Sequence, residues 1–184
     1  MVQYELNTER LLLRQFTEND SEALNRISNQ EYVLNWMPDW KSSMDGTKRL
    51  IRFFIEQYPV ANKYSARVMF AVTLEDTGEI IGMVGVGNKK EVDNEIEIAY
   101  FISEHHSGKG YITEAAKTVS NWAVNHLNLD YIIAIVELDN YPSQKVVERC
   151  GFQRIETRTI LNSGEKGEKP FYYYRFYNAS RDRK

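Results

Sequence analysis

The chain has little of what secreted and membrane proteins carry. Its 184 residues include a single cysteine, so no internal disulfide can form, which is typical of a reducing compartment. No apolar run is long enough to cross a bilayer. The first residues also lack the basic and then apolar stretches of a secretion signal. We therefore expect a cytoplasmic protein with no membrane partner.

Charge and composition indicate what kind of globular protein this is. The net charge of −3 disfavours nucleic acid as the main partner. The adjacent His105 and His106 have no further ligands at metal-binding spacing, so we expect no metal site. With 42% hydrophobic and 12% aromatic residues, the chain has enough apolar surface to build a core. We expect one domain over residues 1–179 and a loose tail at 180–184.

The spacing of apolar residues predicts an alternation of strands and helices. Helices are expected at residues 20–28 and 47–58, from Thr113 onward, and between Pro142 and Gly151. Residues 35–44 are expected to form a loop rich in aromatic side chains, and the polar residues 162–169 to join the last two strands. Strands are expected at residues 11–16, 69–74, 80–87, 95–102, 131–136, 152–161 and 171–177. This order predicts a mixed α/β sheet with helices on both faces.

A glycine-punctuated turn lies between the predicted strand at 95–102 and the helix that begins at Thr113. Gly108 and Gly110 would let backbone N–H groups close around an anion, with the positive end of the helix dipole behind them. The spacing fits neither the P-loop nor the dinucleotide fingerprint. The turn is therefore a candidate pyrophosphate site, and the alternative is a turn that only joins two packed elements.

Several motifs, in order along most of the chain, resemble one enzyme family. They are T-E-R-L-L-L-R at residues 8–14, I-I-G-M-V-G-V at 80–86, the strand and glycine turn, E-L-D-N-Y-P-S at 137–143, and C-G-F at 150–152. Together they resemble the GNAT superfamily of acetyl-coenzyme A-dependent N-acetyltransferases, and more narrowly its ribosomal-protein (RimJ/RimL-type) branch. The resemblance implies a central, mostly antiparallel mixed sheet. Its two central strands, at 95–102 and 131–136, would splay apart into a slot for the pantetheine arm.

The resemblance also implies which residues hold acetyl-coenzyme A. Backbone groups of Tyr100, Phe101 and Ile102 would pair with the pantetheine like an added strand, and Asn140 and Ser143 would lie against the cofactor. The pyrophosphate would bind at Ser107, Gly108, Lys109, Gly110, Tyr111, Ile112 and Thr113. Two of these depart from the family pattern, which has Arg or Gln in place of Ser107 and Gly or Ala in place of Ile112. Binding would then depend on the backbone.

Transfer from a thioester to an amine needs a neutral amine, a stabilised oxyanion and a proton for the leaving thiolate. Glu97, on the strand that would line the slot, is the candidate base, although an acidic strand edge in solvent is the competing interpretation. The resemblance places Ser143 near the sulfur. Tyr141 is an alternative acid, and Asn140 and Ser143 could instead only cap a helix. A backbone N–H near Phe101 would stabilise the oxyanion.

The acceptor is expected to contact Arg14, Trp36, Trp40 and Glu97, unless the tryptophans are core residues. A peptide α-amine, with a pKa of about 7.7–8.0, loses its proton far more easily than a lysine amine near 10.4. We therefore expect a peptide or protein N-terminus as acceptor, attracted by an acidic strand face, and we expect Glu97→Gln to slow the reaction most at low pH. A small amine (polyamine, amino-sugar antibiotic or metabolite) as acceptor, a non-catalytic acetyl-coenzyme A sensor and an unrelated interaction module remain alternatives. The protein could be a monomer or a homodimer.

Overall fold

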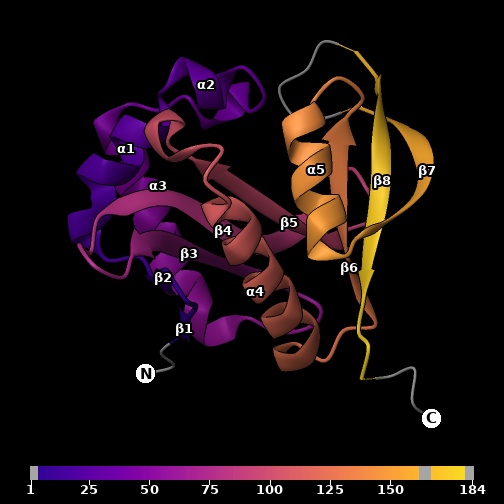
Figure 1. Cartoon of the computed structure of the whole chain (residues 1–184), viewed down its shortest axis with the longest axis horizontal. Helices are drawn as coiled ribbons and strands as arrows, with labels where there is room; N and C mark the ends of the chain where they lie inside the picture. Colours follow the sequence, from indigo (N-terminus) through magenta and orange to yellow (C-terminus); the bar gives the residue numbers. More distant parts are fainter. Residues whose placement is uncertain (1–3, 162–166, 181–184) are drawn as a thin grey trace.

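The computed structural model describes residues 4–161 and 167–180, so the predicted tail beyond residue 180 and most of the predicted polar loop lie outside it. Its strands form a single eight-stranded sheet in the order β1-β2-β3-β4-β5-β6-β8-β7 (Figure 1). The strands are β1 (Glu5–Asn7), β2 (Leu11–Gln15), β3 (Arg67–Leu74), β4 (Ile80–Lys89), β5 (Glu95–Ile102), β6 (Tyr131–Glu137), β7 (Gln153–Ile160) and β8 (Lys169–Tyr177).

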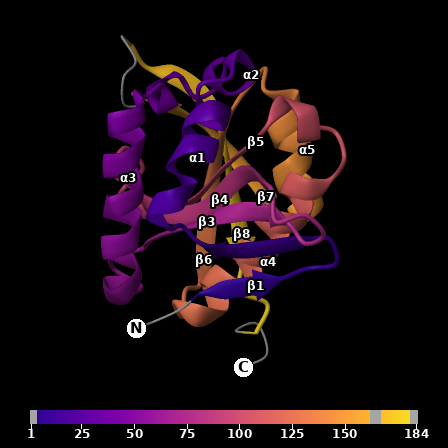
Figure 2. The ribbon, with the colours of Figure 1, turned by 90° about the vertical axis from the view of Figure 1, so that its left-hand side faces the viewer.

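Helices cover both faces of the sheet, as predicted. On one face, α1 (Ser21–Ser28) and α3 (Met44–Gln57) contact each other, β4 and β3. On the other face, α4 (Tyr111–His126) packs against α5 (Tyr141–Cys150), β4 and β5. The two groups stand on opposite sides of the strands in Figure 2. The short α2 (Glu31–Leu34) and four 3₁₀ turns complete the fold: η1 (Glu18–Asp20), η2 (Pro38–Trp40), η3 (Tyr58–Val60) and η4 (Glu104–His106).

The sheet is antiparallel everywhere except between its two central strands. β5 and β6 run parallel and are paired at only one position, Glu97 with Ile133. β6 is instead paired along its length with β8 on its other side. Beyond Glu97, therefore, the carboxyl-terminal half of β5 has no strand partner on the β6 side. The predicted mixed, mostly antiparallel sheet with splayed central strands is confirmed.

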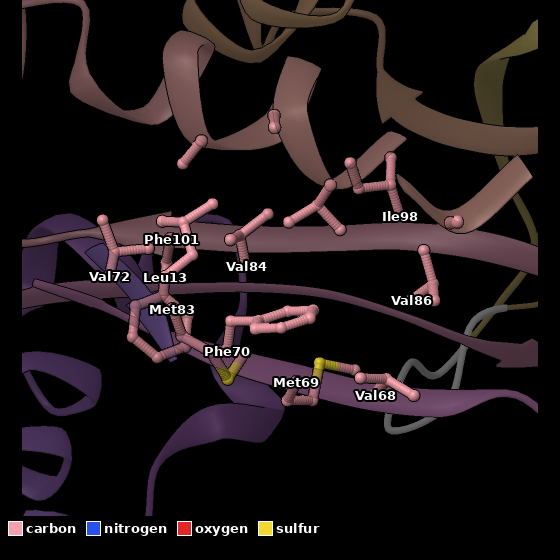
Figure 3. Packing of buried hydrophobic residues seen from close by; sticks show 14 of the residues in the cluster. Leu13, Val68, Met69, Phe70, Val72, Met83, Val84, Val86, Ile98 and Phe101 are labelled. Atoms are coloured by element: carbon pink, nitrogen blue, oxygen red, sulfur yellow. The ribbon is translucent and has the colours of Figure 1, made fainter. Parts of the chain in front are cut away.

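The core lies on both faces of the sheet, and its α4 side includes residues from the three strands β3, β4 and β5. Val68, Val86 and Ile98 are directly paired neighbours on three adjacent strands, so their side chains share one face of the sheet. All three belong to the packed cluster labelled in Figure 3. Phe70 follows Val68 on that face and meets the ring of Trp122 from α4 edge to face, with centroids 5.2 Å apart. These residues pack β3, β4 and β5 against the helix, and the pairing between these three strands is continuous, in contrast to the single pair between β5 and β6.

Most elements lie where the apolar pattern predicts them, and β5 has the predicted bounds. The aromatic loop predicted at 35–44 is wrong in part, because it contains η2 and the first residue of α3. Ser43 caps α3 by accepting the N–H of Gly46, so the helix begins before the predicted Thr47. Two short elements, β1 and α2, were not predicted because three or four residues are too few for a periodicity to show.

Candidate active site

A cavity of about 710 Å³ occupies the splay between β5 and β6. It reaches both faces of the sheet, because its lining includes η2 and the β4–β5 turn on one side and the start of α4 and α5 on the other. Its size is in the range of small-molecule and cofactor sites. The predicted site residues in its lining are Trp36, Trp40, Glu97, Tyr100, Phe101, Ile102, Ser107, Gly108, Gly110, Ile112, Thr113, Asn140 and Ser143. Four others, Arg14, Lys109, Tyr111 and Tyr141, are not part of it.

Glu97 lies on β5 at the point where the two central strands separate. The backbone N–H of Ile135 donates a hydrogen bond to its carboxylate, so the side chain spans the narrow end of the splay. Desolvation by burial raises the pKa of Glu97 to about 7, and the nearby positive charge of Lys89 opposes that rise. A carboxylate with this pKa exchanges its proton near neutral pH, which is what a general base requires.

The glycine turn has the backbone of an anion site. Gly108 and Gly110 have φ of +72° and +83°, a conformation that glycine adopts without strain, and no protein atom lies within 4 Å of where a side chain at Gly108 would begin. No side chain caps the start of α4. The N–H groups of its first turn have no intrahelical partner, and two residues of that turn, Ile112 and Thr113, line the cavity. A helix start of this kind is suited to an anion, so the turn stays the candidate pyrophosphate site.

A clamp from the first hairpin holds this turn, and it was not predicted. The Arg10 guanidinium bonds the Glu114 carboxylate at 2.6 Å and the Lys109 carbonyl at 3.1 Å, and it stacks over the Tyr111 ring. Thr8 donates a second hydrogen bond to Glu114 at 2.6 Å. Burial alone would raise the pKa of Glu114, but these hydrogen bonds outweigh it and hold the pKa below its usual value. Lys109 and Tyr111 thus shape the turn from outside the cavity.

Two hydroxyl groups meet on the α5 side of the cavity. The Tyr100 phenol oxygen lies 2.8 Å from Ser143 Oγ and 3.3 Å from the Ser143 carbonyl, two acceptors that compete for its single proton. Asn140 caps α5 by accepting the Ser143 N–H at 3.1 Å, so the capping interpretation holds for Asn140 while both residues also line the cavity. Tyr141 is 64% exposed and outside the cavity. The phenol next to Ser143 therefore belongs to Tyr100.

Aromatic residues cover the opposite mouth of the cavity. Trp36 and Trp40 are half-buried, and Trp40 packs edge to face on Phe101 with ring centroids 5.1 Å apart. Both tryptophans keep part of their surface in the cavity, so they are not simple core residues. Tyr32, on the neighbouring α2, lines the same mouth.

Arg14, which was expected to contact the acceptor, is engaged elsewhere in the fold. Its guanidinium makes two hydrogen bonds to the Asp20 carboxylate, at 2.8 and 2.9 Å, outside the cavity. Although burial acts the other way, the bonds from Arg14 and Thr17 hold the pKa of Asp20 below its usual value. Arg14 therefore fastens β2 to the start of α1.

The acidic strand face is also not what the sequence suggested. Glu95 accepts hydrogen bonds from the hydroxyls of Tyr131, at 2.6 Å, and Tyr173, at 2.8 Å. The guanidinium groups of Arg158 and Arg175 lie 3.7 Å from its carboxylate. Glu95, with these partners, is not in the cavity lining, so of the acidic residues on β5 only Glu97 faces the cavity.

Two negative observations concern the described ranges alone. No helix there is long and apolar enough to cross a membrane. Within the same residues, no group of three or more His, Cys, Asp or Glu side chains is placed to hold a metal ion.

Comparison with known proteins agrees with this geometry. The family model "Acetyltransferase (GNAT) domain" matches residues 10–153. An uncharacterized N-acetyltransferase, YnaD of Bacillus subtilis, is 27% identical over 149 residues, covering 81% of this chain and 82% of its own. The ribosomal-protein-serine acetyltransferase of Escherichia coli is 25% identical over 150 residues, covering 79% and 80%.

A GNAT-family acetyltransferase structure from Bacillus anthracis superposes with a TM-score of 0.78 at 23% identity, covering 95% of this chain and 98% of its own. At this identity the structural match shows the fold alone. The family model, which spans most of the chain and includes the splay and the glycine turn, speaks for the enzyme class. The chain therefore belongs to the GNAT family of acetyltransferases.

Proposed function

We propose that the protein transfers the acetyl group of acetyl-coenzyme A to the α-amine of a peptide or protein N-terminus. The observation that carries this proposal is the placement of Glu97 and the Tyr100–Ser143 pair in one cavity that opens on both faces of the sheet. A base and a proton donor can then act on the two ends of one reaction from opposite sides of the splay.

The cavity suits a long phosphorylated thioester. The glycine turn offers backbone donors at one end, and the unpaired edge of β5 at Tyr100, Phe101 and Ile102 offers amide groups along its length. When bound, acetyl-coenzyme A supplies the acetyl group as an activated thioester. The loss of a side-chain donor at Ser107 matters less in this arrangement, because the turn itself provides the phosphate contacts.

The residues of this chain have separable roles. Glu97, with its pKa near 7, accepts a proton from the neutral amine as its nitrogen attacks the thioester, directly or through a water. Ser143 Oγ gives its proton toward the departing sulfur, and Tyr100 orients that hydroxyl. Trp36 and Trp40 shield the acceptor mouth and exclude bulk water from the reacting atoms.

An N-terminal amine fits this base better than a lysine amine does. A base of pKa about 7 is nearly matched to an α-amine of about 7.7–8.0 but lies more than three pKa units below a lysine at about 10.4. The ribosomal-protein-serine acetyltransferase relative supports a protein acceptor. The single cysteine, Cys150, is a buried free thiol, which supports a cytoplasmic site of action.

The test is a peptide that carries a free N-terminus and one internal lysine. Coenzyme A release measures turnover, and mass spectrometry of the peptide locates the acetyl group. We expect acetylation at the α-amine and a large loss of rate in Glu97→Gln. Acetyl found chiefly on the lysine would contradict the proposed acceptor. Acetyl-coenzyme A binding with no turnover on any amine would point to a sensor.

A further inference from the structure

Three adjacent strands bring a basic residue into line with the proposed base. Arg67 pairs with Gly87, and Gly87 pairs with Glu97. Directly paired residues point to the same face of a sheet, so the side chains of Arg67 and Glu97 share one face on either side of a glycine. The next row has the same form, Met69 with Gly85 with Ala99. The Met69 side chain covers Gly85 in that row, whereas Gly87 and Ala99 line the cavity, and we call the surface formed by Gly87 and Ala99 the trough.

Arg67 leans over this trough. Its Cζ lies 3.6 Å from the position that a Cβ on Gly87 would occupy, which is ordinary van der Waals contact. Arg67, Gly87 and Glu97 all line the cavity, on the same side as Trp36 and Trp40. The absence of a side chain at Gly87 therefore lets the guanidinium reach toward Glu97 across the acceptor side of the cavity.

The guanidinium of Arg67 has few partners of its own. It makes one long hydrogen bond, 3.5 Å to the carbonyl of Asn88, and its charge lies 5.8 Å from the ring centre of Phe53. It forms no ion pair with any residue in the described ranges, whereas Arg10 and Arg14 each hold a carboxylate there. A half-buried guanidinium with five donors gains most from a carboxylate, which it can bind through two parallel hydrogen bonds.

We infer that Arg67 binds a carboxylate of the amine acceptor, so that the enzyme prefers acceptors with an acidic group close to the reacting amine. This inference rests on the proposed function, in which the amine lies at Glu97. Two strand spacings separate the Cα atoms of Arg67 and Glu97, roughly 10 Å at about 5 Å each. Because both side chains extend into the trough, the gap suits an amine and a carboxylate on the same residue or on neighbouring residues.

The carboxylate could come from an acidic side chain near a peptide N-terminus or from the main-chain carboxylate of a free amino acid. Both sources present a carboxylate to Arg67, and two pairs of acceptors distinguish one source from the other. One pair of peptides is Ser-Asp-Ala-Ala and Ser-Asn-Ala-Ala, each with an amidated C-terminus so that only one carboxylate differs. The second pair is alanine and alaninamide.

Three variants and one control carry the test. Arg67→Gln removes the charge and keeps a polar side chain, Arg67→Lys keeps the charge but loses the two-pronged geometry, and Arg67→Glu reverses the charge. Arg52→Gln is the control, because Arg52 is exposed on α3, outside the cavity, and pairs only loosely with Glu18 at 3.5 Å. Thermal unfolding shows whether each variant is folded.

For the wild type we expect kcat/KM to favour the acidic member of one pair by about 10- to 100-fold, as for a hydrogen-bonded charge pair. Arg67→Gln should bring that ratio close to one, chiefly by lowering kcat/KM on the acidic member. Arg67→Glu should invert the preference, and Arg52→Gln should change nothing. A wild-type ratio of one for both pairs, or a preference that survives in Arg67→Gln, overturns the inference.

Binding is measured in parallel by calorimetry with the same acceptors, without relying on turnover. Tighter binding of an acidic acceptor that depends on Arg67, with no acetylation, would support the Arg67 site and count against the proposed reaction. Turnover that does not depend on the carboxylate would support the proposed reaction and contradict the inference about Arg67. If the acceptors show no binding and no turnover, the result counts against both the Arg67 site and the proposed reaction.

Discussion

The phenol oxygen of Tyr100 lies 2.8 Å from Ser143 Oγ and so joins β5 to the first turn of α5 across the cavity. Burial raises the pKa of Tyr100, so the phenol stays protonated and available as a donor at neutral pH. If Tyr100 donates to Ser143 Oγ, the serine keeps its own proton for the departing sulfur. The pair then acts as a chain in which Tyr100 orients and polarises Ser143.

This relationship predicts unequal but coupled effects on turnover. Ser143→Ala should lower kcat by about 10²-fold or more, as for loss of a positioned proton donor, and Tyr100→Phe by about tenfold. The double variant should be no slower than Ser143→Ala, because Tyr100 has nothing left to orient. Steady-state kinetics measure these losses, and calorimetry should show coenzyme A affinity unchanged in all three.

The control for this series is Tyr141→Phe. Tyr141 is mostly exposed and outside the cavity, so its variant should match the wild type. Losses for Tyr100 and Ser143 that multiply in the double variant would show two independent roles. A loss confined to Tyr141→Phe would assign the proton donor to Tyr141, the alternative acid from the sequence.

The raised pKa of Glu97 predicts a specific pH dependence. The ratio of wild-type to Glu97→Gln rates cancels the ionisation of the amine itself. Because Glu97 is a base only when deprotonated, this ratio should be largest above pH 7 and fall about tenfold per pH unit below it. This reverses the expectation from sequence that the substitution matters most at low pH. A ratio that grows toward low pH would contradict the role of Glu97 as base.

The same pKa predicts an effect on stability, independent of turnover. A carboxylate whose folded-state pKa lies above its unfolded value binds protons more tightly when folded, so the protein loses stability as pH rises from about 4.5 to about 7. Glu97→Gln should therefore raise the unfolding temperature at pH 8 and change it little at pH 4.

Lys89→Met, which removes a charge that lowers the pKa of Glu97, should move the midpoint of the pH–rate profile to higher pH.

Much of the fold and part of the site follow from local sequence. β5 was predicted with its correct bounds because its alternation is long and regular, and Gly108 and Gly110 mark the phosphate turn by the backbone they allow. Nothing local distinguishes Tyr100 from Tyr141 as the partner of Ser143. That choice depends on which phenol reaches α5 across 43 residues of sequence. Arg67 carries no local signal either, since only strand register brings it opposite Glu97.

The glycine turn predicts a matched pair of variants. Gly108 and Gly78 have nearly the same φ, +72° and +71°, and neither has a protein atom within 4 Å of where a side chain would begin. Glutamate at either position therefore imposes similar backbone strain, but only at Gly108 does it place bulk and negative charge in the cavity. We expect Gly108→Glu to abolish coenzyme A binding in calorimetry and Gly78→Glu to leave it intact. Equal affinities in the two variants would show that the phosphates bind elsewhere.

The Arg14–Asp20 pair predicts a loss of stability without a specific loss of catalysis. Asp20 is buried, and its pKa is lowered, so its contribution to stability should be complete above about pH 4 and disappear as pH falls through the lowered folded-state pKa. Asp20→Asn should lower the free energy of unfolding by about 2–4 kcal/mol at pH 7, because it leaves a half-buried guanidinium without its partner. The difference in stability from the wild type should be smaller at pH 3. Glu18→Gln breaks the exposed pair with Arg52 and should cost at most about 1 kcal/mol. Denaturant unfolding measures both, and a fall in kcat/KM of folded Asp20→Asn at low temperature would restore an acceptor role for this pair.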